Sequence, residues 1–152
     1  MNIVFEKYAR RIIVDMNQAK FTFRNAKDNS TFVVDTFLYL DNSKSKSSIV
    51  SIGEIAPEKY LSKPDIYRVD VFDMGNSFPP KSTVNRNDLV EIIFKYGLGW
   101  FYRNDFIPRL RPIVFILGAE RFNDYFANPK DDITIAAKNG GAKEIIFDKT
   151  DL

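Results

Sequence analysis

The segment PIVFILG, Pro112–Gly118, decides the fold of this 152-residue chain. A short apolar run rich in β-branched and aromatic residues predicts a strand, and burial on both faces favours a parallel sheet. A helix is predicted over Lys130–Lys138, with acidic residues at its positive N-terminal end, and Asn139–Gly141 ends it. A second apolar run, Glu144–Phe147, follows. Strand, helix and strand in this order predict a βαβ unit.

The N-terminal third of the chain predicts three strands joined by short turns. Arg11–Asp15 is apolar, ends in a carboxylate and is expected to be the central strand. Lys20–Arg24 alternates polar and apolar residues, which is the period of a half-buried strand. Thr31–Leu40 is expected to be a third strand with a break at Asp35. Turns rich in Asn, Asp and Ser separate the strands, so they predict an antiparallel meander.

The middle of the chain predicts smaller elements. Ile49–Ile52 is expected to be a short strand, and Tyr67–Phe72 an edge strand. Gly53–Tyr60 is expected to contain a helical turn, with a proline near its start. Met74–Ser82 contains a glycine and two prolines and is expected to be a loop.

The longest helix is predicted over Asp88–Arg103, capped by Asn85 or Asn87. It carries two apolar stripes at helical spacing. In one interpretation both stripes belong to the core. In the other, the second stripe meets a partner, because large exposed apolar patches usually mark an interface. The first stripe is Leu89, Ile92, Ile93, Tyr96 and Trp100, and the second is Phe94, Leu98, Phe101 and Tyr102.

The composition excludes several kinds of site. The chain has neither cysteine nor histidine, which excludes disulfides, thiolate and imidazole metal sites, and catalysis by Cys–His or Ser–His–Asp groups. A net charge of +2 does not indicate a nucleic-acid partner. No apolar run approaches the ~20 residues of a membrane helix, and a cytoplasmic location is expected. Met1–Tyr8, followed by Arg10 and Arg11, is either a frayed or sheet-docked terminus, which we favour, or a small membrane-surface anchor.

The order of these elements predicts an α/β fold of the ribonuclease-H-like kind, as a single domain over residues 1–152. Its mixed sheet is an antiparallel meander extended by the βαβ unit, with the helices packed on the sheet.

Four segments, in the same order along the chain, resemble segments of the MreB family of actin-like ATPases. Arg11–Lys20 resembles the strand and first phosphate loop of that family, and Ser48–Ala56 resembles its apolar strand followed by Val-Gly-Glu-Glu-Ala. Leu89–Ile116 resembles its helix, basic loop and next strand, and Ala136–Phe147 its alanine-rich helix, turn and strand. The resemblance implies the first, ribonuclease-H-like subdomain of an actin-fold protein, truncated to about half the usual length or less.

The phosphate loop that this resemblance implies is degenerate. Asn17 and Gln18 stand where the family has glycine and threonine, and losing the glycine crowds the approach of a phosphate. Asp15 matches a metal-associated aspartate, whereas Lys20 is interpreted as an exposed edge charge of a strand rather than a phosphate ligand. Thr150 stands where the family has its water-positioning glutamate, and threonine cannot act as a carboxylate. We therefore expect no catalytic residue, no metal site and no cofactor.

These residues predict a non-enzymatic, MreB-like interaction or assembly module that self-associates or binds a protein partner, in bacterial cell shape or the cytoskeleton. No nucleic-acid partner is expected. The interacting surface is expected to be an uncovered sheet face or the second stripe of the long helix, Phe94, Leu98, Phe101 and Tyr102.

Two other functions stay open. One is a divergent nucleotide-binding protein that completes a site for ATP and Mg²⁺ by oligomerising, with Asp15, Lys20 and Gly118 as its residues. The other is a metal-dependent nuclease of the ribonuclease-H-like fold, with carboxylates from Asp15, Glu91 and Glu120.

Overall fold

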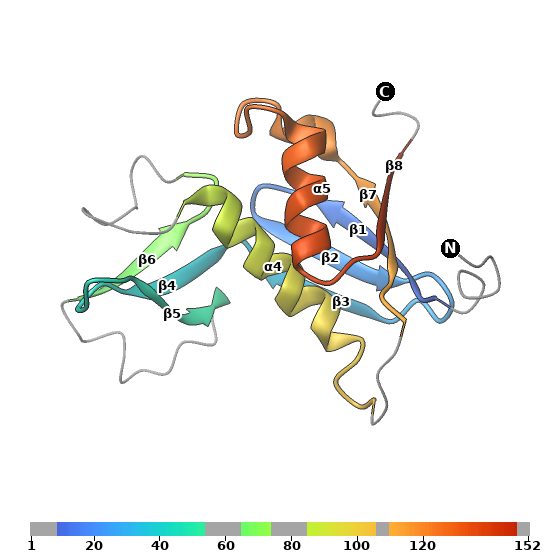
Figure 1. Cartoon of the computed structure of the whole chain (residues 1–152), viewed down its shortest axis with the longest axis horizontal. Helices are drawn as coiled ribbons and strands as arrows, with labels where there is room; N and C mark the ends of the chain where they lie inside the picture. Colours follow the sequence, from blue (N-terminus) through green and yellow to red (C-terminus); the bar gives the residue numbers. More distant parts are fainter. Residues whose placement is uncertain (1–8, 54–64, 74–84, 106–109, 149–152) are drawn as a thin grey trace.

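A computed structural model of the chain describes residues 9–53, 65–73, 85–105 and 110–148. Its larger sheet orders five strands as β3 (Thr31–Asp35), β2 (Lys20–Asn25), β1 (Arg11–Met16), β7 (Ile113–Leu117) and β8 (Glu144–Phe147) (Figure 1). The first three form an antiparallel meander, and β1, β7 and β8 run parallel. The predicted meander, the central position of β1 and the βαβ unit are all confirmed.

A second sheet was not predicted. Its three strands are ordered β5 (Ser48–Ile52), β4 (Phe37–Asp41) and β6 (Ile66–Asp70). The strands expected near Ile49–Ile52 and Tyr67–Phe72 are the two edges of this sheet, on either side of β4.

The prediction of one strand over Thr31–Leu40 is wrong, because the chain leaves the larger sheet at Thr36, one residue after the expected break. The amide of Thr36 donates to the carbonyl of Ala19 at 3.0 Å, and its hydroxyl donates to the carbonyl of Gln18. The amide of Val71 in turn donates to the carbonyl of Thr36 at 2.9 Å. These long-range hydrogen bonds hold the chain where it passes from one sheet to the other.

Two α-helices, α4 (Arg86–Trp100) and α5 (Pro129–Asn139), pack on one face of the larger sheet, together with the short 3₁₀ helix η2 (Ala119–Phe122). α4 begins beside the three-stranded sheet and then crosses the larger one (Figure 1). A continuous buried cluster joins the helices to the inward residues of both sheets, for example Val14 of β1, Leu38 of β4 and Ile133 of α5. This core is rich in phenylalanine, which explains much of the high aromatic content.

The helix ends follow the predicted chemistry. The side chain of Asn85 accepts a hydrogen bond from the amide of Asp88 at 2.9 Å, and the Asp88 carboxylate accepts one from the amide of Asn85 at 3.3 Å. This reciprocal capping box confirms Asn85 as the N-cap of α4. Gly141, just beyond α5, has a φ of 125°, which glycine adopts without strain.

α4 approaches the sheet very closely at Gly97. A Cβ atom at this position would lie 2.2 Å from Cζ of Phe23 on β2, so no larger residue fits without movement. The ring of Phe23 also packs edge-on against Phe94, with ring centroids 6.1 Å apart. This contact fixes which side of α4 faces the sheet.

That orientation corrects the predicted stripes of α4. The second stripe is not an exposed partner surface, because Phe94, Leu98 and Phe101 are 0, 2 and 8% exposed within the core of the chain itself. Tyr102 is partly buried against the same core. Tyr96, predicted to be core, is instead 43% exposed on the outer side of the helix.

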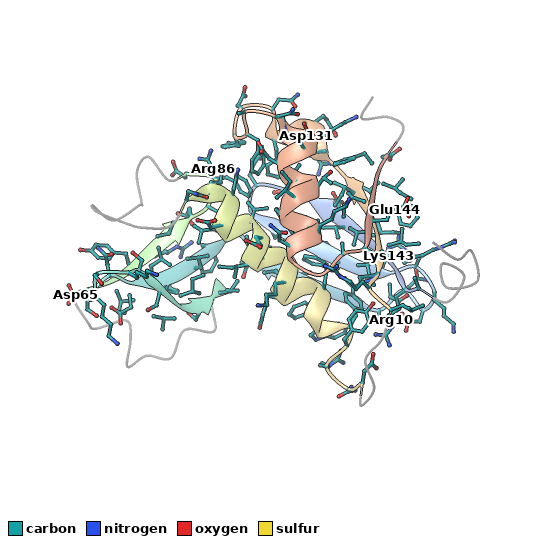
Figure 2. The ribbon with its side chains drawn as sticks, in the orientation of Figure 1. Arg10, Asp65, Arg86, Asp131, Lys143 and Glu144 are labelled. Carbon is teal, nitrogen blue, oxygen red and sulfur yellow. The ribbon has the colours of Figure 1, made fainter. Side chains whose placement is uncertain are left out.

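Two arginines join elements that are distant in sequence (Figure 2). Arg86 donates from Nε to the carbonyl of Val71 at 2.9 Å and from Nη1 to that of Tyr125 at 2.8 Å. Arg10 donates to the carbonyl of Phe101 at 2.6 Å and pairs with Asp105 at 3.1 Å. Arg86 thus links the start of α4 to the end of β6. Arg10, just before β1, links that strand to the end of α4.

Several predictions lie outside the described residues. These are the terminal segment Met1–Tyr8, most of the helical turn at Gly53–Tyr60, the whole loop Met74–Ser82, and Thr150.

The two glycines of α4 are expected to respond oppositely to alanine. Gly97→Ala should lower the free energy of unfolding by about 1–3 kcal/mol, because the new methyl group overlaps Phe23. Gly99→Ala should raise it by about 0.5–1 kcal/mol, because no atom of the described structure lies within 4 Å of the added Cβ and alanine favours the helix. Urea denaturation at low protein concentration measures both, and equal effects would contradict the packing described.

Candidate functional site

The turn between β1 and β2, where the resemblance implies a phosphate loop, is a closed hairpin. The amide of Asn17 donates to the carbonyl of Lys20 at 3.0 Å, and the amide of Ala19 donates to the side chain of Asn17 at 2.9 Å. Loops that cradle phosphate do so with free backbone amides. Two amides of this turn are already bonded within the hairpin.

Arg121 of η2 occupies the space beside this hairpin. Its Nη1 lies 3.1 Å from Oδ1 of Asp15 and donates to the carbonyl of Met16 at 2.8 Å. The side chain of Gln18 donates back to the carbonyl of Arg121 at 2.9 Å. The Asp15 carboxylate therefore pairs with a guanidinium, in an ion pair that is partly exposed to solvent.

Gly118 lies between these groups, at the end of β7. Its φ is 83°, and a Cβ there would lie 2.7 Å from the carbonyl oxygen of Met16 and 2.8 Å from Nη1 of Arg121. Glycine is thus required by the chain's own packing. Lys20 is exposed at the start of β2, which is an inner strand and not an edge of the sheet, and it lies opposite Asp35 in the register of β2 and β3.

The residues at this corner do not fit a nucleotide phosphate with Mg²⁺. A carboxylate that orders the water shell of Mg²⁺ needs its oxygens toward the ion. Here the side chain of Asp15 is paired with Arg121, and the amides of Asn17 and Ala19 are engaged within the turn. The sequence pattern missed Arg121, because 106 residues separate it from Asp15 and no local motif marks the pair.

The structure does not bring the three proposed nuclease carboxylates together. Asp15 lies at the end of β1, whereas Glu91 borders a small hollow between α4 and α5 with Asp132. Glu120 belongs to η2. Within the described parts of the chain, no group of three or more acidic residues is placed to hold a metal ion.

The exposed side of α4 carries a row of residues that we call the outer stripe: Asp88, Ile92, Lys95, Tyr96, Gly99 and Arg103. Phe32 of β3 and Ile52 of β5 flank it, and together with Trp100 they enclose a largely apolar groove of about 670 Å³.

Stacked aromatic rings and a cation form the wall of this groove. The rings of Phe32 and Trp100 are stacked, with centroids 5.1 Å apart and planes 4° from parallel. The guanidinium of Arg103 lies 3.7 Å from the centre of the Trp100 ring and donates to its carbonyl at 2.6 Å. The groove thus has an apolar floor and cations, Lys95 and Arg103, along it.

No family model and no curated protein matches the sequence. The solved structures similar to the chain include two of MreB5. The crystal structure of MreB5 of Spiroplasma citri bound to ADP superposes with a TM-score of 0.59 at 15% identity. The structure of MreB5 of the same organism bound to AMPPNP gives 0.56 at 14%. The fold is actin-like.

This similarity covers 92% of the chain, which confirms the predicted ribonuclease-H-like, actin-like fold. The chain spans 38% of the length of each MreB5 chain. Neither α4 nor α5 has the length and apolar character needed to cross a membrane, and no other helix in the described residues does.

Tyr102 makes one contribution to stability that depends on pH. Burial raises the pKa of the Tyr102 phenol, against an opposing effect of Arg10, and its hydroxyl donates to the carbonyl of Leu110 at 3.2 Å. Because the folded-state pKa is raised, this contribution is complete below the unfolded value of about 10 and is lost as the pH rises through the folded value.

Tyr102→Phe is expected to cost about 1 kcal/mol near neutral pH through the lost hydrogen bond. The difference from the wild type should shrink above pH ~10. Urea denaturation across alkaline pH measures this, and a constant difference would show that the phenol titrates alike in the folded and unfolded chains.

Proposed function

We propose that the chain is a non-enzymatic, actin-like assembly module that self-associates through the outer stripe of α4. The observation that carries the proposal is that this stripe is complementary to itself in the antiparallel direction. Residues three and four apart lie on one side of a helix, so Asp88, Ile92, Lys95 and Gly99 form a continuous row, and Arg103 follows in the turn just beyond the helix.

Consider a two-fold axis that passes between Lys95 and Tyr96. It places residues equally distant from the axis opposite one another, so Ile92 of one copy faces Gly99 of the other. The large side chain then fills the space that the glycine leaves open. No atom of the described chain lies within 4 Å of a Cβ built on Gly99, so its own packing does not require a glycine there.

The charges of the stripe match in the same arrangement. Asp88, near the start of α4 in one copy, faces Arg103, just beyond the end of α4 in the other copy. The two-fold axis repeats this pair, so the dimer has two of them. Lys95 faces the exposed ring of Tyr96, a pairing that favours cation–π contact. The aromatic groove beside the stripe, lined by Phe32 and Trp100, would receive the partner's side chains. Complementary charges fix the register of such an interface.

The non-enzymatic part of the proposal is argued from the residues where β1 and β7 end. The pairing of Asp15 with Arg121 and the hydrogen bonds within the hairpin argue against a phosphate cradle there. Both MreB5 structures carry a nucleotide, so nucleotide binding is the second candidate. As part of the proposal, we assign the module to the cytoplasm and to a cytoskeletal or cell-shape task, as the sequence resemblance implies.

Charge reversal tests the self-association. Arg103→Glu and Asp88→Arg should each weaken dimerisation by about tenfold, because each places like charges opposite one another. The double variant should recover most of the affinity, because the pair is restored with opposite sign. Sedimentation equilibrium measures the dissociation constants, and Lys27→Glu, in the exposed β2–β3 turn, is the matched control.

Thermal melts of each variant check folding, since Asp88→Arg also removes the capping-box carboxylate. A wild-type chain that stays monomeric up to millimolar concentration would contradict the proposal. So would a double variant no better than the two single ones.

ATP with Mg²⁺ at millimolar concentration should leave the melting temperature unchanged. A ligand present at ~100 times its Kd would add ~2.7 kcal/mol, which shifts a domain of this size by several degrees. Differential scanning fluorimetry of the wild type and of Asp15→Ala makes the comparison. A rise in the wild type that Asp15→Ala abolishes would favour the nucleotide-binding candidate instead.

A further inference from the structure

The groove beside the outer stripe has the size and composition of a small-molecule site. Phe32 of β3, Ile52 of β5 and Ile92 of α4 give it apolar walls. Its volume of about 670 Å³ lies within the ~300–1,000 Å³ that is usual for ligand pockets. Such pockets are mostly apolar, and a few polar groups in them fix the orientation of the ligand.

The floor of the groove is open because Gly99 has no side chain. This glycine lies inside α4, where alanine would make the helix more stable. Packing requires glycine at Gly97, against Phe23, but no atom of the described structure lies within 4 Å of a Cβ built on Gly99. An occupant that lies against the backbone of the helix would explain why a glycine stands there.

The charges along the groove are positive. Lys95 and Arg103 are exposed, and they are the charged side chains among the described residues that line it. Arg103 lies over the Trp100 ring and uses Nη1 on the carbonyl of that residue, and its guanidinium has further N–H donors. The acidic residues of α4, Asp88 and Glu91, border a different hollow, between α4 and α5. The groove therefore favours an anion over a cation.

We propose that the groove binds a small carboxylate with an apolar chain, of the medium-chain fatty acid class. The chain lies along α4 over Gly99, against Phe32 and Ile52. The carboxylate pairs with Arg103, which the Trp100 ring already holds in place. A second copy of the protein would use the same groove, so the ligand competes with self-association. Only this competition rests on the proposed function.

Trp100 is the only tryptophan of the chain, so its fluorescence reports on the groove directly. The probe is decanoate, used below the concentration at which it forms micelles. Decyltrimethylammonium has the same chain length with a positive head group. Decanoate should change the emission of Trp100 in a saturable way, and the Kd of the cation should be at least about tenfold higher. Dilute protein keeps this measurement independent of self-association.

Two variants and a control locate the ligand. Gly99→Leu fills the floor of the groove and should weaken decanoate binding by at least about tenfold. Lys95→Glu with Arg103→Glu should reverse the preference, so that decyltrimethylammonium binds more tightly. Lys27→Glu with Lys138→Glu makes the same change in net charge at exposed positions that do not line the groove, and should leave binding unchanged. Thermal melts confirm that each variant folds.

Sedimentation equilibrium at high protein concentration measures the competition. Saturating decanoate should raise the dissociation constant of the dimer by at least about tenfold, because each copy must release its ligand before it can pair. The same concentration of decyltrimethylammonium should have little effect.

Equal binding of decanoate and the cation, or decanoate binding that survives Gly99→Leu, would overturn the proposed ligand. Binding of vesicles containing phosphatidylserine without binding of decanoate would also overturn it, and would assign the groove to a lipid surface. A dimer that binds decanoate without dissociating would overturn the competition. A chain that binds decanoate but is monomeric at every concentration would overturn the proposed self-association and leave the ligand site standing.

Discussion

The contact between the ring of Phe23 and the backbone of α4 at Gly97 sets the architecture. Because a Cβ there would lie 2.2 Å from the ring, α4 can lie this close to β2 only with glycine at that position. The contact rotates Phe94 and Leu98 into the core and turns Ile92, Tyr96 and Gly99 outward. The surface proposed for assembly is thus a consequence of how the core packs.

The sequence resemblance implies a phosphate loop at the corner between β1 and β7. The structure instead has an ion pair between Asp15 and Arg121 there. Gly118 allows Arg121 to reach both the carboxylate of Asp15 and the carbonyl of Met16. A guanidinium at this place joins two strand ends and stabilises the hairpin between β1 and β2. We interpret the corner as a structural joint, which agrees with a module that acts through its surfaces.

The elements that local patterns describe could be predicted. The apolar run of β7, the alternation of β2 and the cap at Asn85 all depend on nearby residues. A break was expected one residue before Thr36, but the second sheet could not be predicted, because the change of sheet depends on hydrogen bonds of Thr36 with Ala19 and Val71. The exposed side of α4 was assigned wrongly for a similar reason. Both apolar stripes have helical spacing, yet Phe94 and Leu98 of the second are buried, while the first divides into buried Leu89 and Ile93 and exposed Tyr96.

Site-specific cross-linking tests the central claim, antiparallel assembly through α4, most directly. The sequence has no cysteine, so a single introduced cysteine is the only thiol that can cross-link. With Tyr96→Cys, beside the proposed axis, a short bismaleimide should produce a covalent dimer at high yield. Ile135→Cys, at a 58% exposed position on α5, should stay largely monomeric. Equal yields for the two variants, or no dimer with Tyr96→Cys, would contradict the account.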